Sequence, residues 1–371
     1  MKTGIVILCV FMVAGLVCFM SPLAFAGDRY TVTDLGTLKE AYGVNDSGIV
    51  AGYYDGAPGW PSAAYWSGGT TYLLPPINPA HATSVAYSVN DSGQFAGDCQ
   101  STVGYNHATL WEGGTARDLG TLGGNESYGV GISDAGYVVG QSLTSTDPME
   151  CFTNAFIWKD GVMTDLGRLE YGRVSRAEAV NDSGAAAGVS ETSGGYHAAL
   201  WQNGTITDLG TFDGDSSNAH GINNQTEIVG RSAKQPEPGS YQGFWYAFLW
   251  KDGVMYDLGI DLEGSGSVAY DINNLSQIVG GGGEYYTHAW LWEEGDWSLL
   301  NDLIPEDSGW DLIRAYSISD SGYICGMGKY GNTYRSFLLS PTQPPVVPEP
   351  ATMALMGLGI AGLAARRRKH S

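Results

Sequence analysis

The chain has 371 residues, of which 15% are charged, 12% are aromatic and 54 are glycine. Low charge combined with many aromatic residues excludes a disordered chain, and the absence of a Gly-X-Y period excludes collagen. The net charge is −21, with the acids concentrated in residues 27–340, so we expect no nucleic-acid partner because an acidic surface repels phosphate.

The first 26 residues have the pattern of a secretory signal peptide. Lys2 precedes an apolar stretch, and the small-x-small triplet Ala24-Phe25-Ala26 closes the segment. We therefore expect cleavage after Ala26 and a mature protein that begins near Gly27 outside the cytoplasm, where disulfides are stable.

Residues 27–340 contain seven copies of one sequence repeat. Its first marker is an Asn-Asp-Ser-Gly turn or a variant of it, and its second marker is an apolar segment that ends in tryptophan. A third marker, Asp-Leu-Gly, closes most units. The turns begin at Asn45, Asn90, Ser133, Asn181, Asn223, Asn273 and Ser319. A recurring unit of this length indicates a repeat architecture.

Each unit predicts four short strands, which we name A to D. In the third unit these are Tyr128–Ser133, Tyr137–Gln141, Asn154–Trp158 and Val162–Leu166. Tight Asx- and glycine-rich turns join A to B and C to D, which is a strong hairpin signal. Four antiparallel strands in such a unit are typical of a propeller blade, so we predict an all-β, seven-bladed β-propeller.

The strand count also predicts how the ring closes. Residues 30–35 form a D strand that precedes the first A strand, whereas the seventh unit has A, B and C strands only. We expect the N-terminal strand to complete the last blade, because this removes an open sheet edge. The first two units depart most from the pattern, so their blade register is left open.

The repeat resembles the HAF family of extracellular repeats. The resemblance rests on His-Ala-x-Leu-Trp at His107–Trp111, His197–Trp201 and His288–Trp292, and on the recurring Asn-Asp-x-Gly and Asp-Leu-Gly. The segment Arg335–Leu339 also fits the family pattern. The resemblance implies secretion and a repeat fold, and it implies no reaction.

Loop lengths point to one face of the ring as the binding surface. The A–B and C–D turns share one face and are uniformly tight, whereas the B–C and D–A loops share the other face and vary. Aromatic residues in the B–C loops suit stacking on sugar rings, although ordinary loop packing is an equal alternative. These candidates are Tyr54, Trp60, Tyr105, Tyr196, Tyr241, Trp245, Tyr285, Tyr286 and Tyr330.

The sequence carries no catalytic signature. It has no Gly-x-Ser-x-Gly elbow, phosphate-binding loop, His-Glu-x-x-His or Cys-x-x-Cys motif, and no carboxylate pair stands out as an acid–base dyad. We therefore predict a non-catalytic protein that binds extracellular polysaccharide or a surface partner. A polysaccharide-acting hydrolase or lyase on the same scaffold, and a purely structural acidic surface protein, are the alternatives.

We expect no cofactor. The Asn-Asp-x-Gly turns favour structural turn chemistry over calcium binding, because Asn and Asp cap their own turns. Asp213, Asp215 and Asn218 are a weak calcium candidate. The repeated histidines favour packing or hydrogen bonding, since equivalent positions in different blades lie far apart.

Two cysteines of the mature chain are expected to pair. Cys99 and Cys151 fall in the predicted B–C loops of neighbouring blades on one face of the ring, which predicts a Cys99–Cys151 disulfide in an oxidising compartment. Cys325 lies in an apolar strand and is expected to be a buried free thiol.

The C-terminus has three parts. Residues 341–350 are a proline-rich linker, Ala351–Ala365 is an apolar run too short for a stable membrane span, and a basic cluster follows. This tail resembles the PEP-CTERM sorting signal of Gram-negative bacteria. The residues that carry the resemblance are Val347, Pro348, Glu349, Pro350, Arg366, Arg367 and Arg368.

The PEP-CTERM resemblance implies where the protein is sorted. It implies that an exosortase-type enzyme recognises and cleaves residues 351–371 after transient anchoring in the inner membrane. The protein then becomes extracellular or cell-surface, in bacteria that make exopolysaccharide. A simple C-terminal anchor is the alternative.

Overall fold

The structure is a computed structural model. It describes residues 28–343 apart from 57–59, 80–82, 148, 150–151, 236–243, 261, 263–264 and 284–286. The predicted signal peptide with its cleavage site at Ala26, most of the proline-rich linker and the sorting tail therefore lie outside the described residues.

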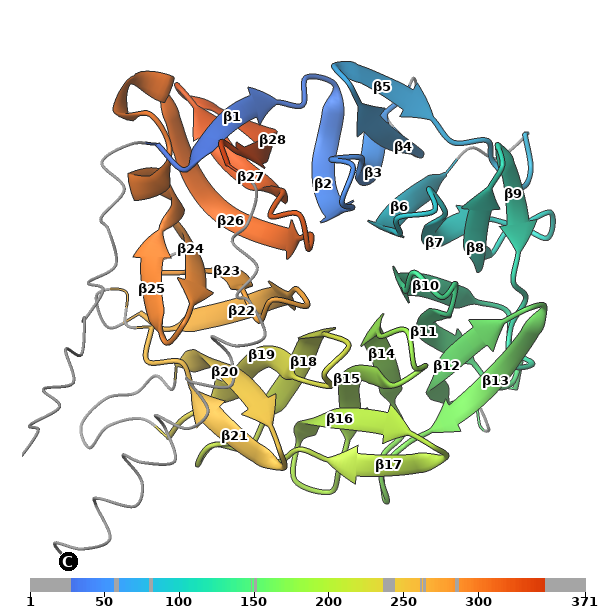
Figure 1. The fold of residues 1–371 in the computed structure, drawn as a ribbon. Helices are drawn as coiled ribbons and strands as arrows, with labels where there is room; N and C mark the ends of the chain where they lie inside the picture. Colours follow the sequence, from blue (N-terminus) through green and yellow to red (C-terminus); the bar gives the residue numbers. More distant parts are fainter. Residues whose placement is uncertain are drawn as a thin grey trace, which may run out of the picture.

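The described residues form seven four-stranded antiparallel sheets arranged in a ring, which confirms the predicted seven-bladed propeller (Figure 1). Blades one to three are β2–β5 (Leu38–Val44, Val50–Asp55, Pro61–Ser67, Thr70–Leu73), β6–β9 (Ser84–Val89, Phe95–Gln100, Asn106–Glu112, Thr115–Asp118) and β10–β13 (Ser127–Ile132, Val138–Leu143, Thr153–Lys159, Val162–Gly167).

Blades four to six continue the ring with the same order of strands. They are β14–β17 (Ser175–Val180, Ala186–Glu191, Tyr196–Gln202, Thr205–Asp208), β18–β21 (Ser217–Ile222, Ile228–Ala233, Trp245–Lys251, Val254–Asp257) and β22–β25 (Ser267–Ile272, Ile278–Gly282, His288–Glu293, Asp296–Leu299). The first strand of each blade lines the centre of the ring and the fourth lies at its rim.

Blade seven is closed by the N-terminal strand, as the strand count predicts. It contains β26 (Trp310–Ile318), β27 (Ile324–Tyr330), β28 (Thr333–Pro341) and β1 (Tyr30–Asp34). The pairing of β1 with β28 is antiparallel and runs from Tyr30 opposite Pro341 to Asp34 opposite Phe337. Arg335 Nη1 also donates to Asp34 Oδ2 at 2.7 Å, so the two ends of the ring are held by both backbone and side chains.

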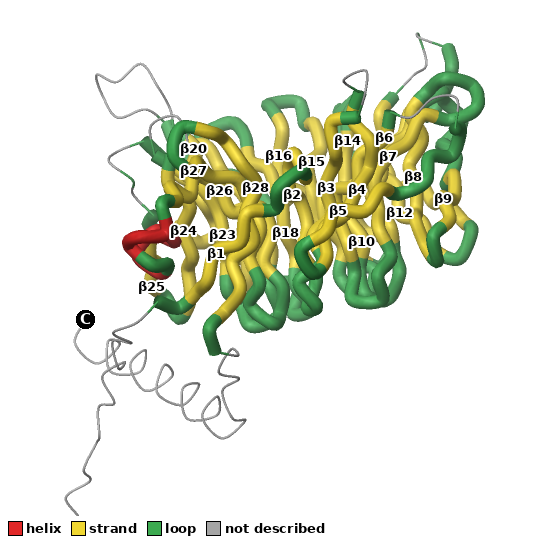
Figure 2. The backbone as a smooth tube through the Cα atoms, turned by 90° about the horizontal axis from the view of Figure 1, so that it is seen from above, coloured by secondary structure: helices red, strands yellow, loops and turns green. Residues whose placement is uncertain are grey.

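Two short 3₁₀ helices precede blade seven, η1 (Leu300–Leu303) and η2 (Glu306–Ser308). Figure 2 shows the ring edge-on, with the strands running between two faces that carry the turns and loops. We call the face with the A–B and C–D turns the turn face, and the face with the B–C and D–A loops the variable face.

The core of the molecule lies between blades rather than within them. Seven buried apolar clusters each combine residues of two neighbouring blades. One cluster joins Leu200 of β16 to Ile228 and Phe248 of the next blade. The inner strands carry a buried alanine at the same position in six blades, and Gly129 takes this place in the third. Small residues are required there because the blades converge toward the axis.

Deleting residues 28–35 is expected to expose the edge of β28 and to remove the buried Tyr30 from the last core cluster. An open edge pairs with other chains, so the deleted protein should associate in a concentration-dependent manner. Size-exclusion chromatography of the mature and deleted proteins tests this. An equally monomeric deletion variant would show that the closing strand is dispensable.

Candidate functional site

A β-bulge in every inner strand turns one side chain into the central channel. In every blade the pairing of the first and second strands is interrupted at one equivalent position, where the inner strand contributes one extra residue, and blades one and seven have a second such interruption nearer the start of the inner strand. A bulge re-aims the side chain of that residue. The seven bulge residues are Tyr42, Tyr87, Val130, Glu178, His220, Tyr270 and Tyr316, and all line one cavity of about 360 Å³.

The bulge residues of five consecutive blades form an aromatic arc. Ring centroids are 5.9 Å apart for His220 and Tyr270, 5.5 Å for Tyr270 and Tyr316, 6.3 Å for Tyr316 and Tyr42, and 5.3 Å for Tyr42 and Tyr87. These separations suit edge-to-face and tilted aromatic pairs. Nothing in the repeat markers identified this arc, but a tyrosine stands three positions before the repeated turn in four of the seven units.

The opposite arc of the channel is formed by Val130 and Glu178, so it carries one ionisable bulge residue. Arg176 and Glu178 form an ion pair at 2.5 Å, and burial raises the pKa of Glu178 although the arginine opposes the rise. Burial lowers the pKa of His220 to about 3, helped by the positive charges of Arg231 and Arg176. The imidazole of His220 is therefore neutral at physiological pH and does not act as a cation in the channel.

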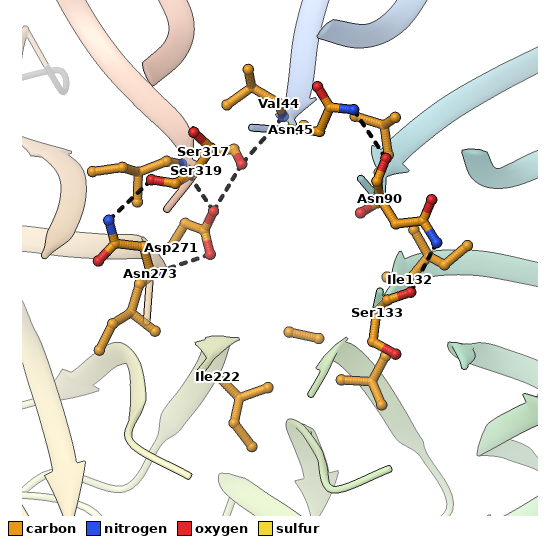
Figure 3. A pocket seen from close by; sticks show the side chains of 18 of the residues that line it. Val44, Asn45, Asn90, Ile132, Ser133, Ile222, Asp271, Asn273, Ser317 and Ser319 are labelled. Carbon is orange, nitrogen blue, oxygen red and sulfur yellow. Dashed lines mark hydrogen bonds between the residues drawn. The ribbon is translucent and has the colours of Figure 1, made fainter. Parts of the chain in front are cut away.

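The cavity reaches the turn face, where the repeated Asn side chains bind neighbouring blades (Figure 3). Asn45 Oδ1 accepts hydrogen bonds from Ser47 N at 3.1 Å and Ile49 N at 3.0 Å, which caps its own turn. Asn45 Nδ2 donates to the carbonyl oxygen of Asn90 in the next blade at 3.0 Å. The predicted capping of the turn by its Asn side chain is thus confirmed, and the same side chain also joins the blades.

The residue after the repeated Asn or Ser completes a ring of hydrogen bonds around the channel mouth. Asp46 N donates to Asp91 Oδ1 at 2.8 Å, and the pattern continues around the ring until Ser321 N donates to Asp46 Oδ1 at 2.6 Å. Burial raises the pKa of Asp91 and of Asp134, and neighbouring carboxylates add to the rise. The seven acceptors are Asp46, Asp91, Asp134, Asp182, Asn224, Asn274 and Asp320.

A further carboxylate of the channel is also engaged in structural bonds. Asp271 Oδ2 accepts from Ser317 Oγ at 2.8 Å and from Ile318 N at 3.0 Å, which ties blade six to blade seven (Figure 3). Burial raises the pKa of Asp271 to about 6. Asp271 and the carboxylates of the channel mouth therefore serve inter-blade contacts.

Two of the three histidines of the tryptophan-bearing strands bind the Asp of the Asp-Leu-Gly marker within their own blade, whereas His288 Nδ1 lies 3.0 Å from Thr287 Oγ1. His107 Nδ1 lies 2.9 Å from the Asp118 carboxylate, and His197 Nδ1 lies 2.9 Å from the Asp208 carboxylate. The hydrogen bond to Asp118 raises the pKa of His107. The expected hydrogen-bonding role of these histidines is confirmed.

The weak calcium candidates lie beside and within the start of blade five. Asp213 and Asp215 are exposed in the loop before β18, whereas Asn218 lies on β18 itself. Asp213 Oδ1 accepts a hydrogen bond from Gln235 N at 2.9 Å. The described part of the chain holds no group of three or more His, Cys, Asp or Glu side chains that could bind a metal ion. The calcium site stays a prediction.

Five of the nine aromatic residues predicted for the variable face lie at its surface or beneath an arginine. Trp60, Tyr105, Tyr196 and Tyr330 are 61%, 43%, 43% and 49% exposed, and they come from four different blades. Trp245 at the start of β20 lies under the guanidinium of Arg231, whose Cζ is 4.5 Å from the ring centroid. The structure places these five residues around the ring and does not bring them together.

The other aromatic candidates divide between the core and the undescribed segments. Tyr54 packs against the core cluster that contains Leu38 and Val50, so its expected place in a binding loop is wrong. It lies within β3, where the pairing with Leu38 directs it toward the blade interface. Tyr241, Tyr285 and Tyr286 lie outside the described residues.

The cysteines correct one expectation and confirm another. Cys99 is a buried free thiol inside β7, not a loop residue, and its sulfur accepts a hydrogen bond from Ile77 N at 3.3 Å. The predicted Cys99–Cys151 disulfide therefore has no support from the structure, and Cys151 lies outside the described residues. Cys325 is a buried free thiol, as expected.

Comparison with known families explains the C-terminus. Residues 346–369 match the PEP-CTERM protein-sorting motif, which confirms the predicted signal. The protein is thus an exported exosortase target on a propeller scaffold, and the motif implies a transient membrane anchor. Within the part of the chain that the structure describes, no helix has the length and apolar character needed to cross a membrane. No curated protein matches the chain.

Solved structures resemble the chain in fold only. The β-propeller domain of the trilobed protease from Pyrococcus furiosus, which has an open velcro topology, matches at a TM-score of 0.52 and 8% identity, over 85% of this chain and 97% of that one. A structure of YCF48 bound to D1 peptide matches at a TM-score of 0.47 and 12% identity, over 88% of this chain and 99% of that one. These identities are too low to carry function from one chain to another.

Proposed function

We propose that this protein is a non-catalytic, exported glycan-binding propeller that associates with exopolysaccharide through its variable face. The observation that carries the proposal is the exposure of Trp60, Tyr105, Tyr196 and Tyr330 on that face, one from each of four blades. Sugar rings stack on flat aromatic faces, and a polymer can contact several separated sites at once. The resemblance to the HAF family, which implies secretion, agrees with this assignment.

The bonding of the channel carboxylates favours binding over catalysis. A glycoside-cleaving enzyme needs two carboxylates that flank the bond and are available for proton transfer or nucleophilic attack. Here Asp271 accepts two hydrogen bonds from blade seven, and Glu178 is paired with Arg176. The four variable-face aromatics, in contrast, are between 43% and 61% exposed, although the ring of Tyr330 also lies 5.5 Å from that of Trp310.

A polysaccharide pull-down with the mature protein tests the proposal. A Trp60→Ala/Tyr330→Ala variant is expected to lose most of the retention shown by the wild type, because each exposed aromatic contributes about 1 kcal/mol of stacking. Tyr256→Ala is the matched control, since Tyr256 is equally exposed but lies on the outer strand β21.

Each outcome separates the proposal from its alternatives. Loss in the double variant with full retention in the control supports a glycan site on the variable face. Equal retention in all three proteins would place the contact elsewhere, and no retention by the wild type would contradict glycan binding. Release of reducing sugar by the wild type would show that the protein is an enzyme.

A further inference from the structure

One loop of the variable face departs from its counterparts in conformation. The D–A loop from Asp165 to Ser175 is as long as the loop from Asp257 to Ser267, and it is one residue longer than the loops from Asp118 to Ser127 and from Asp208 to Ser217. The loops that begin at Asp118, Asp165 and Asp208 are otherwise equivalent, because each closing serine hydroxyl donates to the carbonyl oxygen of the glycine in Asp-Leu-Gly.

The extra length is taken up by Tyr171 in a left-handed conformation. Its φ is +70°, and it is the only described non-glycine residue with positive φ outside the tight A–B and C–D turns. The side chain is 78% exposed, so no packing offsets the unfavourable backbone. A bulky residue held this way commonly marks a functional site.

Two arginines accompany this tyrosine in a strongly acidic protein. In the loops that begin at Asp118 and Asp208, the hydroxyls of Thr121 and Thr211 donate to the carbonyl oxygen of a glycine three residues on. Arg168 occupies the equivalent position, and its Nε donates to Gly172 O at 2.7 Å. Its Nη1 donates to Asn154 Oδ1 at 2.7 Å. The arginine therefore makes the loop hydrogen bond that threonine makes in the other two loops, and it also adds a positive charge to the surface.

The second arginine extends the positive surface. The guanidinium of Arg173 lies 5.6 Å from the centroid of the Phe152 ring, and that of Arg168 lies 4.2 Å from it. The backbone nitrogen of Arg173 donates to Glu191 Oε2 at 2.7 Å, which fixes this end of the loop. The residues Phe152, Arg168, Tyr171 and Arg173 line one surface pocket, with Glu170 as its acidic member.

We propose that this pocket binds an acidic sugar residue, a uronate, of the polysaccharide. An exposed aromatic face stacks on a sugar ring, while arginine guanidinium groups match the geometry of a carboxylate. This inference rests on the proposed glycan-binding function and names the charge class of the glycan. It places that recognition in the loop between blades three and four.

The test compares acidic and neutral forms of one probe by titration calorimetry with the mature protein. The probes are a galacturonate oligosaccharide and its fully methyl-esterified form, with a mannuronate oligosaccharide to cover a second uronate. The wild type is expected to bind an acidic oligosaccharide about tenfold more tightly than the ester, as one or two charge-assisted hydrogen bonds provide.

The variants carry the residues found at the equivalent positions of the loop from Asp118 to Ser127. An Arg168→Thr/Arg173→Asn variant keeps the loop hydrogen bond and is expected to lose the preference for the acidic form. A Tyr171→Gly variant is expected to weaken binding of both forms and, because glycine accepts positive φ, to raise the urea midpoint of unfolding.

The outcomes distinguish this inference from the proposed function. If the wild type binds ester and acid equally, or the arginine variant keeps its preference, the uronate pocket is wrong while glycan binding stands. If the wild type binds none of the three probes, the pocket is again wrong, and the polysaccharide pull-down alone decides the broader function. A Tyr171→Gly variant with full affinity would also overturn the proposal.

Discussion

Replacing Asn181 with alanine is expected to lower the free energy of unfolding by about 3 kcal/mol. The side chain is almost fully buried, and its Oδ1 accepts from Ser183 N and Ala185 N at 3.1 and 3.0 Å. Its Nδ2 donates to Asn223 O in the next blade at 3.1 Å. Ser183 Oγ also donates to Asn181 Oδ1 at 2.7 Å, so alanine removes four hydrogen bonds and leaves backbone groups of both blades without these partners. Urea unfolding of the mature protein measures the loss.

Serine at the same position is the matched comparison. Ser133 and Ser319 occupy this position in two blades, and their hydroxyls accept from Tyr137 N at 3.4 Å and Tyr323 N at 3.2 Å. An Asn181→Ser variant should therefore lose about half as much stability as the alanine variant. Thr205→Ala, on an exposed outer strand, should change stability by less than about 0.5 kcal/mol. An alanine variant as stable as that control would contradict the inter-blade role.

Replacing Asp98 with asparagine is expected to stabilise the protein at neutral pH and not in acid. Asp98 is buried in β7, where burial raises its pKa to about 6 and a hydrogen bond with Tyr87 opposes the rise. Its Oδ2 also accepts from Asn106 Nδ2 at 2.9 Å, which an asparagine oxygen can replace. The variant removes the cost of ionising a buried carboxyl.

The direction of the pH dependence follows from the two pKa values. In the unfolded chain Asp98 ionises near pH 3.9, whereas in the folded protein it holds its proton until about pH 6. The wild type therefore loses stability as pH rises from about 4 to about 6, and the asparagine variant lacks this loss. The stability difference between the two proteins should shift by about 2 to 3 kcal/mol in favour of the variant over this range.

Urea midpoints at about pH 4 and about pH 7.5 measure this shift. Asp160→Asn is the control, because Asp160 is exposed in a C–D turn with positive φ that asparagine also accepts. The control should follow the wild type at both pH values. A difference between Asp98→Asn and the wild type that does not change with pH would show that the pKa of Asp98 is the same in the folded and the unfolded protein, which contradicts the prediction.

The predicted loop positions of Cys99 and Tyr54 were wrong because they were inferred from nearness to a loop in the sequence. Cys99 and Tyr54 stand near the ends of their strands in the sequence, yet both lie inside strands and face the core between blades. The last residues of a strand alternate between faces, so a shift of one residue decides between core and loop. The sequence did not fix that register in the first two units, which departed from the pattern.

The sequence pattern did not predict which side chains line the channel, again because strand register decides it. Tyr42 and its six equivalents point inward only because a bulge interrupts the pairing of each inner strand. The repeat markers locate the turn and the tryptophan, but they do not reveal an unpaired residue between them. The inter-blade bond from Asn45 to Asn90 is likewise invisible until the two turns are placed side by side.

The sequence by itself determined the number of blades, the closing of the ring by residues 30–35 and the sorting signal at residues 346–369. These features are local or repeated, so hydrophobic periodicity, turn chemistry and a short linear motif suffice to specify them. Only the tertiary structure decided which side chains enter the channel, which carboxylates join the blades and that Tyr171, Arg168 and Arg173 line one pocket. These features depend on contacts between distant segments and on strand register, which emerge only when the blades pack together.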